Sequence, residues 1–200
     1  MKRTLLTSLT ALVALALATT SLRAAARPNI LWLTAEDMSP NLGCYGDTEA
    51  RTPRLDALAR ESVRYTRAFA TAPVCSPSRS CLITGMFATS LGTQRLRSAF
   101  PVPAEFGPFT AGLRKAGYHC SNNVKTDYNL RDEPAFVRAA WDASSNKAHW
   151  RGRRAGQPFF AVFNSVKSHE SQLRGYKLPT ITDPAKVRVP AYHPDVPEVR

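Results

Sequence analysis

The chain of 200 residues carries 27 lysines and arginines against 15 aspartates and glutamates, which gives a net charge of +12 at pH 7. Neither zinc-finger spacing, nor a ribonucleoprotein aromatic pattern, nor heptads accompany this charge, so a nucleic-acid-binding module is not supported. The four cysteines, at positions 44, 75, 81 and 120, are too few for a dense disulfide framework, and we expect buried free thiols whose pairing cannot be deduced.

The first 26 residues have the three parts of a secretory signal peptide. Residues 2–3 are Lys-Arg, residues 5–18 are rich in Leu, Ala and Val, and residues 24–26 form an Ala-Ala-Ala cleavage site. The apolar run is too short for a membrane-spanning helix, so we expect cleavage before Arg27 and no stable membrane insertion afterwards; an uncleaved anchor is the alternative. In both cases the folded part works in the periplasm or is secreted, where a basic protein meets acidic glycans.

Residues 27–34 predict the first strand. A proline is followed by a short, branched, apolar run, which is typical of a central strand buried on both faces. Glu36 and Asp37 come directly after it, and in open α/β sheets ligands gather outside the carboxyl ends of the strands. Adjacent carboxylates there favour a hard divalent cation such as Ca²⁺ or Mg²⁺; the alternative is a pair of turn or helix-capping carboxylates.

A helix and a second strand are expected between residues 52 and 69. Thr52 and Pro53 supply a cap and a first-turn proline for the helix. Residues 63–69 alternate roughly between apolar and polar side chains, which predicts a strand. This βαβ order indicates an α/β fold with a parallel sheet.

The run Val-Cys-Ser-Pro-Ser-Arg-Ser-Cys-Leu-Ile-Thr-Gly at residues 74–85 is the most chemically specific stretch. Pro77 suits the first turn of a helix and Gly85 suits the residue just past its end, so roughly two helical turns are expected. Cys75 then lies at the helix entrance, where free N–H groups and the helix dipole favour an anion, and Arg79 adds charge-assisted hydrogen bonds. Cys81 is expected to point into the core.

The Cys-Ser-Pro-Ser-Arg core at 75–79, followed by Leu82, Thr84 and Gly85, resembles the signature of the type I sulfatases. The resemblance implies that a formylglycine-generating enzyme oxidises Cys75 to formylglycine, an aldehyde whose hydrate is the catalytic nucleophile. A buried or metal-binding cysteine on a surface helix is the alternative.

The resemblance also implies a metal site. The family has an acidic pair at the position of Glu36 and Asp37, commonly Asp-Asp, that binds calcium. The implied site is made by Glu36, Asp37 and the converted Cys75, with Ca²⁺ as the ion and Mg²⁺ as an alternative. Arg79 and the metal would together stabilise the nucleophile as an oxyanion.

Two further catalytic residues follow strands expected at 118–124 and 158–164. Lys125 matches the lysine of the family's Gly-Lys-Trp-His element, which lies close to the sulfate, while Asp127 replaces the histidine of that element. His169 resembles the histidine of the family's Pro-Phe-Phe…His segment, and would protonate the departing sugar oxygen. An exposed lysine and a satisfied surface histidine are the alternatives.

Residues 27–200 are expected to form the N-terminal, incomplete portion of a sulfatase catalytic domain. The implied fold is an α/β sandwich of the alkaline-phosphatase-like type, with a central, mostly parallel sheet flanked by helices. Complete members continue past this point, so we expect the isolated chain to be inactive and to expose an apolar sheet edge. The proline-rich stretch 178–200 is expected to be extended, with little helix.

The expected function is the hydrolysis of sulfate esters, or of an N-sulfate, in a sulfated carbohydrate. The overall run looks most like the relatives of heparan N-sulfatase and iduronate sulfatase. Two alternatives stay open. One is a phosphonate or phosphodiester hydrolase of the same superfamily, and the other is a truncated, non-catalytic protein that binds sulfated glycans through its basic surface.

Overall fold

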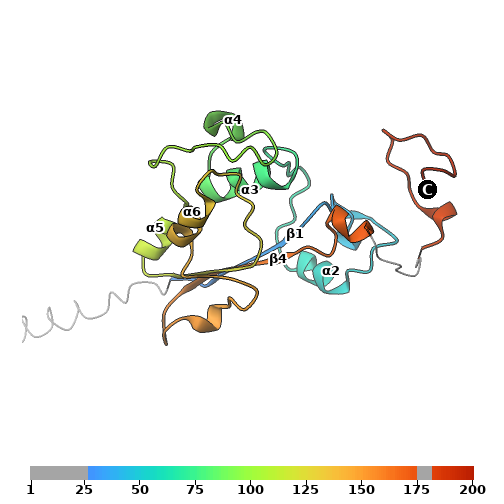
Figure 1. Cartoon of the computed structure of the whole chain (residues 1–200). Helices are drawn as coiled ribbons and strands as arrows, with labels where there is room; N and C mark the ends of the chain where they lie inside the picture. Colours follow the sequence, from blue (N-terminus) through green and yellow to red (C-terminus); the bar gives the residue numbers. More distant parts are fainter. Residues whose placement is uncertain (1–26, 175–181) are drawn as a thin grey trace, which may run out of the picture.

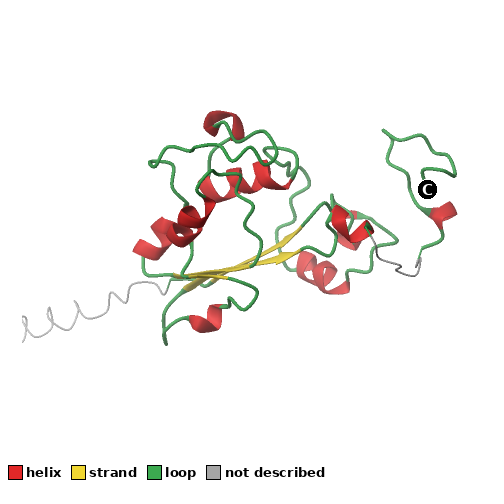
Figure 2. Cartoon of the chain, in the orientation of Figure 1, coloured by secondary structure: helices red, strands yellow, loops and turns green. Residues whose placement is uncertain are grey.

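The computed structural model describes residues 27–174 and 182–200, so the expected signal peptide at 1–26 lies outside the described residues. The described chain combines short helices with short strands, and several helices lie between the first strand and the second (Figures 1 and 2). The strands are β1 (Ile30–Ala35), β2 (His119–Asn123), β3 (Ala143–Ser144) and β4 (Phe159–Ser165). The α-helices are α2 (Pro53–Arg60), α3 (Cys75–Thr84), α4 (Ala88–Leu91), α5 (Thr110–Lys115) and α6 (Glu133–Ala140). Short 3-10 helices are η1 (Gly43–Tyr45), η2 (Trp150–Gly152), η3 (Glu170–Leu173) and η4 (Pro184–Lys186).

The four strands form one parallel sheet in the order β1-β4-β2-β3, which confirms the expected parallel α/β architecture. Ile30 of β1 aligns with Phe160 of β4, and Phe159 aligns with His119 of β2. Because the strands are parallel, the carboxyl ends of β1, β2 and β4 meet at one edge of the sheet. Among the described helices, none is long and apolar enough to cross a membrane.

Helices α3, α5 and α6 lie on one face of the sheet, as the edge-on view in Figure 1 shows. The core beneath them includes Ile83, Cys120, Trp141 and Phe160. The rings of Trp141 and Phe160 stack with centroids 5.9 Å apart and an interplanar angle of 10°. Full burial of a large apolar side chain contributes roughly 1.5–3 kcal/mol, so this layer holds α3 firmly over the sheet.

Strand β1 is not the central strand, buried on both faces, that its apolar run predicted. It lies at the edge of the described sheet, next to β4. Leu31 and Leu33 are 51% and 60% exposed, whereas Ile30 and Trp32 pack against the core. An apolar run is buried on both faces only where both are covered, and the described residues leave the Leu31 side of β1 open.

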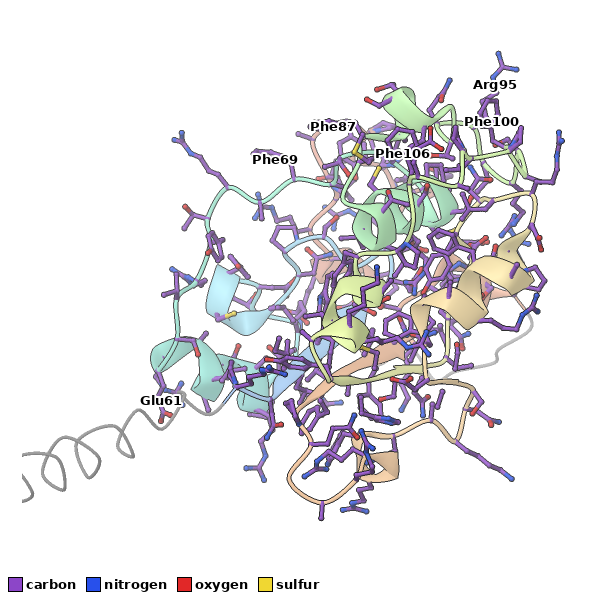
Figure 3. The ribbon with its side chains drawn as sticks, turned by 90° about the vertical axis from the view of Figure 1, so that its left-hand side faces the viewer. Glu61, Phe69, Phe87, Arg95, Phe100 and Phe106 are labelled. Atoms are coloured by element: carbon purple, nitrogen blue, oxygen red, sulfur yellow. The ribbon has the colours of Figure 1, made fainter. Side chains whose placement is uncertain are left out.

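Residues 63–69 form no strand among the described residues, so that prediction was wrong. Val63, Tyr65 and Phe69 are 82%, 72% and 86% exposed. Figure 3 shows Phe69 on the loop that leads to α3. Side-chain alternation describes a surface suited to a strand, but a strand also needs a hydrogen-bonding partner, and this segment has none in the described structure.

The bounds of α2, α3, β2 and β4 agree closely with the sequence, although the Thr52 side chain makes no capping hydrogen bond. Helix α2 begins at Pro53, and α3 ends at Thr84 before Gly85. All four cysteines are free thiols; Cys81 and Cys120 are buried, as expected, whereas Cys44 and Cys75 are only partly buried. The part of the proline-rich stretch that is described, residues 182–200, contains only η4 as helix, while 178–181 lie outside the described residues.

Candidate active site

Cys75 is the first residue of α3, and a strained turn precedes it. Val74 has φ 68° and ψ 156°, a conformation that a β-branched residue rarely adopts and that costs on the order of 1–3 kcal/mol. At the other end of the helix, Gly85 has φ 71° and donates its N–H to the carbonyl of Cys81 at 2.8 Å. The strained residue Val74 therefore lies directly before Cys75, at the entrance of α3.

A cleft joins the start of α3 to the segment that follows β1. Its lining includes Glu36 and Asp37 on one side and Cys75, Ser78 and Arg79 on the other. The predicted nucleophile, the predicted arginine and the acidic pair therefore share one cleft. These residues meet because β1 ends, and α3 begins, at the carboxyl edge of the sheet.

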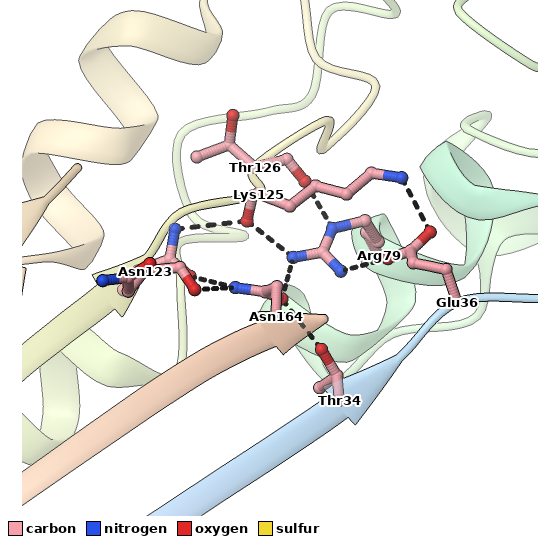
Figure 4. Close-up of polar contacts among 8 residues, drawn as sticks. Thr34, Glu36, Arg79, Asn123, Lys125, Thr126 and Asn164 are labelled. Atoms are coloured by element: carbon pink, nitrogen blue, oxygen red, sulfur yellow. Dashed lines mark hydrogen bonds and ion pairs between the residues drawn. The ribbon is translucent and has the colours of Figure 1, made fainter. Parts of the chain in front are cut away.

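Arg79 is buried, 8% exposed, and bound on several sides (Figure 4). Its Nη1 donates to Glu36 Oε1 at 3.2 Å, and its Nη2 donates to Asn164 Oδ1 at 2.8 Å. The carbonyls of Thr126 and Lys125 accept from Nε and Nη2, each at 2.6 Å. These charge-assisted hydrogen bonds hold the planar guanidinium in one orientation in the cleft.

Glu36 lies between two cations. Its carboxylate is 7% exposed, with Oε1 paired to Arg79 and Oε2 accepting from Lys125 Nζ at 2.7 Å. The Lys125 side chain is only 17% exposed, so this lysine is not the solvated lysine of the alternative interpretation. The cluster of Glu36, Arg79 and Lys125 carries two positive charges against one negative charge, while the Asp37 carboxylate lines the same cleft and the Asp127 carboxylate lies near Cys75. The site therefore offers cations to an anionic substrate within a set of mixed charge.

Burial raises the pKa of the Cys75 thiol, and a hydrogen bond with the Asp127 carboxylate and the charge of Asp127 raise it further, while Lys125 acts in the opposite direction. The thiol is therefore protonated at neutral pH, and a protonated thiol is a poor nucleophile. Asp127 is a site residue that the sequence showed only as a departure from the family's histidine; its place shortly after Lys125 was the available signal.

Asp37 and His169 come close through Glu170, whose N–H donates to Asp37 Oδ2 at 3.0 Å. His169 Nδ1 accepts from the N–H of Ser171 at 3.1 Å. A backbone N–H can only donate, so the ring is neutral here, with its proton on Nε2. A general acid needs the doubly protonated ring, in which Nδ1 also carries a proton and the contact with the Ser171 N–H is lost. Among the described residues His169 does not line the cleft of Cys75, and its catalytic role stays a prediction.

Glu36 and Asp37 offer hard oxygen donors of the kind that calcium prefers, but only some of the ligands that calcium needs. Within residues 27–174 and 182–200, no cluster of three or more His, Cys, Asp or Glu side chains could hold a metal ion. Both oxygens of Glu36 are in ion pairs, and Asp37 Oδ2 accepts from Glu170. Since calcium takes roughly six to eight oxygens, Glu36 and Asp37 would supply only part of its coordination sphere.

The Sulfatase family model matches residues 28–197 of the chain. An ulvan-active sulfatase of Formosa agariphila is 43% identical over 167 residues, which cover 77% of this chain and 27% of that protein. Iduronate 2-sulfatase of Mus musculus is 49% identical over 57 residues, which cover 28% of this chain and 10% of that protein. The chain thus spans about a quarter of the length of the first relative and less of the second.

Solved structures share the fold at low sequence identity. One is of a protein in complex with its substrate D-glucosamine-2-N,6-O-disulfate; it has a TM-score of 0.61 and 22% identity, with 72% of this chain and 35% of that chain covered. A phosphonate monoester hydrolase from Silicibacter pomeroyi has a TM-score of 0.62 and 18% identity, with 84% and 47% covered. These likenesses confirm the expected alkaline-phosphatase-like α/β fold, of which this chain holds a part.

Proposed function

This chain belongs to the sulfatase family, and we propose that it is part of an exported enzyme that hydrolyses sulfate esters, or an N-sulfate, of a sulfated carbohydrate. The observation that carries the proposal is that Cys75, Arg79 and the acidic pair share one cleft, and that Arg79 and Lys125 both pair with the buried Glu36 carboxylate. Relatives named for ulvan and iduronate support a carbohydrate substrate. We propose residues 1–26 as the signal peptide, and the periplasm or the medium as the location.

The nucleophile comes from residue 75. Once a formylglycine-generating enzyme has converted Cys75, its aldehyde hydrate would supply the attacking oxygen. Arg79 is already fixed in the cleft and donates to that oxygen as negative charge develops. Lys125 turns from Glu36 toward the sulfate oxygens. As the sulfur–oxygen bond to the sugar breaks, His169 in its doubly protonated form gives a proton to the departing sugar oxygen. The sulfated hydrate at residue 75 then collapses to the aldehyde and releases sulfate.

Glu36, Asp37 and the converted residue 75 would hold Ca²⁺, with Mg²⁺ as the alternative. The ion would supply positive charge that stabilises the oxyanion of the nucleophile. Asp37 is the better-placed ligand, because its Oδ1 has no hydrogen-bond partner among the described residues. Glu36 becomes a ligand only when it gives up part of its contact with Arg79 or Lys125.

Peptide mass spectrometry after co-expression with a formylglycine-generating enzyme tests the first step. We expect an aldehyde at Cys75 and an unmodified thiol at Cys81, because only Cys75 begins the Cys-x-Pro-x-Arg run. The complete gene product should then hydrolyse an aryl sulfate. An unmodified Cys75 under these conditions contradicts the proposal.

A phosphonate or phosphodiester hydrolase is the second candidate, because phosphonate monoester hydrolases are among the solved structures with this fold. A tetrahedral phosphorus centre carries charged oxygens as sulfate does, so Arg79 and Lys125 suit either group. The ratio of kcat/KM for an aryl sulfate to that for an aryl phosphodiester separates the two. A ratio below one would mean that the enzyme is a phosphodiester hydrolase and would contradict the proposed sulfatase activity.

A further inference from the structure

We propose that Asn164 is a positioning residue, which sets the orientation of the Arg79 guanidinium and thereby leaves one arginine N–H for the nucleophile at position 75. The inference rests on the proposed sulfatase function and adds a residue to its machinery. Figure 4 shows the Asn164 side chain between the strand ends and Arg79.

Every hydrogen-bonding group of the Asn164 amide is used. Its Oδ1 accepts from Thr34 Oγ1 at 3.0 Å and from Arg79 Nη2 at 2.8 Å. Its Nδ2 donates to Asn122 Oδ1 at 2.9 Å and to the carbonyl of Asn123 at 3.1 Å. A flipped amide would place N–H against N–H at Arg79 and oxygen against oxygen at Asn122, so the carbonyl is held toward Arg79.

These contacts tie the orientation of Arg79 to the sheet itself. Asn164 lies near the carboxyl end of β4, aligned with Thr34 of β1, and its amide reaches Asn122 of β2, which is fully buried. Three neighbouring strands therefore fix one side chain. Groups held by strands keep their geometry better than groups held by loops alone.

The N–H groups of Arg79 can be counted. A guanidinium has five of them; one on Nε goes to Thr126, two on Nη2 go to Lys125 and Asn164, and one on Nη1 goes to Glu36. The fifth, on Nη1, is not engaged by a described residue, and Arg79 lines the cleft of Cys75. Without the Asn164 oxygen, one Nη2–H loses its acceptor, and only Thr126, Lys125 and Glu36 still set the orientation of the guanidinium.

Asn164 acts through Arg79 and does not touch the substrate space. Among the described residues it does not line the cleft that holds Cys75. Its loss should therefore lower kcat, which depends on how the arginine meets the developing charge, more than it raises KM.

Asn123 provides a matched control for kinetics on the complete gene product. Its amide also donates two hydrogen bonds at the same sheet edge, to the carbonyls of Asn146 and Ala148 at 3.1 Å each, without touching Arg79. With conversion of Cys75 verified by mass spectrometry, Asn164→Ala should lower kcat on the order of a hundredfold, with KM changed only a few-fold. Asn123→Ala should keep kcat; equal losses in both, or an unchanged kcat for Asn164→Ala, would overturn the inference.

A conservative variant and a double-mutant cycle test that the effect passes through Arg79. Asn164→Asp keeps an oxygen toward Arg79 but loses both amide donors, so it should keep most of kcat; a role confined to joining strands predicts the same loss as in Asn164→Ala. In an Arg79→Lys background, Asn164→Ala should lower kcat only slightly further, because the effects of two coupled residues are not additive. A further hundredfold loss there contradicts the proposal.

A measurement without turnover separates this inference from the proposed function. In ¹⁵N NMR spectra of the 200-residue chain, the Arg79 guanidinium should rotate slowly about its bonds to the Nη atoms, with signals assigned by their loss in Arg79→Lys. Asn164→Ala should accelerate this rotation and Asn123→Ala should leave it unchanged. Unchanged rotation in Asn164→Ala overturns the inference. Accelerated rotation in this chain, together with no aryl-sulfate hydrolysis by the complete, converted gene product, counts against the proposed function alone.

Discussion

Ion pairs lie at both ends of the strands, called the amino edge and the carboxyl edge of the sheet, but the two sets of ion pairs differ in their exposure to solvent. At the amino edge, Arg114 and Asp142 meet at 2.9 Å with side chains 34% and 30% exposed. At the carboxyl edge, Glu36 pairs with Arg79 and Lys125, and the three side chains are 7%, 10% and 17% exposed. An exposed pair contributes roughly 0.2–1 kcal/mol, whereas each buried ion loses several kcal/mol of hydration before pairing. The buried cluster of Glu36, Arg79 and Lys125 loses hydration free energy and lies beside a candidate nucleophile, which makes it a candidate functional site.

Each edge also has a thiol beside an aspartate. Burial raises the pKa of Cys120 to about 12, and the charge of Asp142 adds to this. Burial and Asp127 raise the pKa of Cys75 as well, but Cys75 opens on the cleft while Cys120 is fully buried. The two thiols therefore differ in their exposure to the cleft and not in the presence of an aspartate.

The largest effect is expected from Cys75→Ala. Turnover of the complete gene product should fall to background because the nucleophile is lost, while the free energy of unfolding changes by about 0.5 kcal/mol or less. Cys81→Ala, on the same helix but buried, should lower stability by about 1 kcal/mol and retain turnover. Aryl-sulfate assays and urea unfolding measure both; parallel losses in the two variants would argue that Cys75 is structural.

The second largest effect concerns the ion pairs themselves. Glu36→Gln leaves Arg79 and Lys125 without their buried counter-ion, so the 200-residue chain should lose about 3 kcal/mol of unfolding free energy. Asp142→Asn at the amino edge should cost about 1 kcal/mol or less. Urea unfolding at pH 7 compares the two, and equal losses would show that burial does not distinguish the edges.

Calcium binding should also differ between the two edges, but with a smaller effect. The 200-residue chain should bind Ca²⁺ with a Kd of about 10⁻³ M or weaker, because Glu36 and Asp37 supply few of the oxygens needed, and it should show no turnover even after conversion of Cys75. Asp37→Asn should abolish the binding seen by calorimetric titration, and Asp142→Asn should not. Tight binding with multiple turnovers would contradict this expectation.

The smallest effect is on the Cys75 thiol. Because the Asp127 carboxylate raises its pKa, Asp127→Asn should lower that pKa and increase the thiolate fraction near neutral pH. Alkylation of Cys75 by iodoacetamide, followed by peptide mass spectrometry from pH 6 to 10, should become a few-fold faster at about pH 7. Asp142→Asn is the control and should leave Cys75 unchanged. A slower or unaltered reaction would rule out the Asp127 contact.

Two predictions from periodicity failed for one physical reason. The apolar run of β1 and the alternation of residues 63–69 describe side chains, whereas burial of Leu33 and pairing of Tyr65 depend on which elements cover them. In the described structure both side chains remain exposed. The ends of α3 were predictable because a first-turn proline, Pro77, and left-handed glycine geometry at Gly85 act within a few residues.

The sequence by itself determined the family, the parallel α/β fold class and the position of Cys75 at a helix entrance, whereas the order of elements after the first helix was predicted wrongly. It also marked Glu36, Arg79 and Lys125 one at a time. Only the tertiary structure decided that Glu36 is the counter-ion of the other two and that Asn164 orients Arg79. These contacts join side chains from the ends of different strands and from α3, and the register of the parallel sheet that brings them together is set by packing across the whole chain.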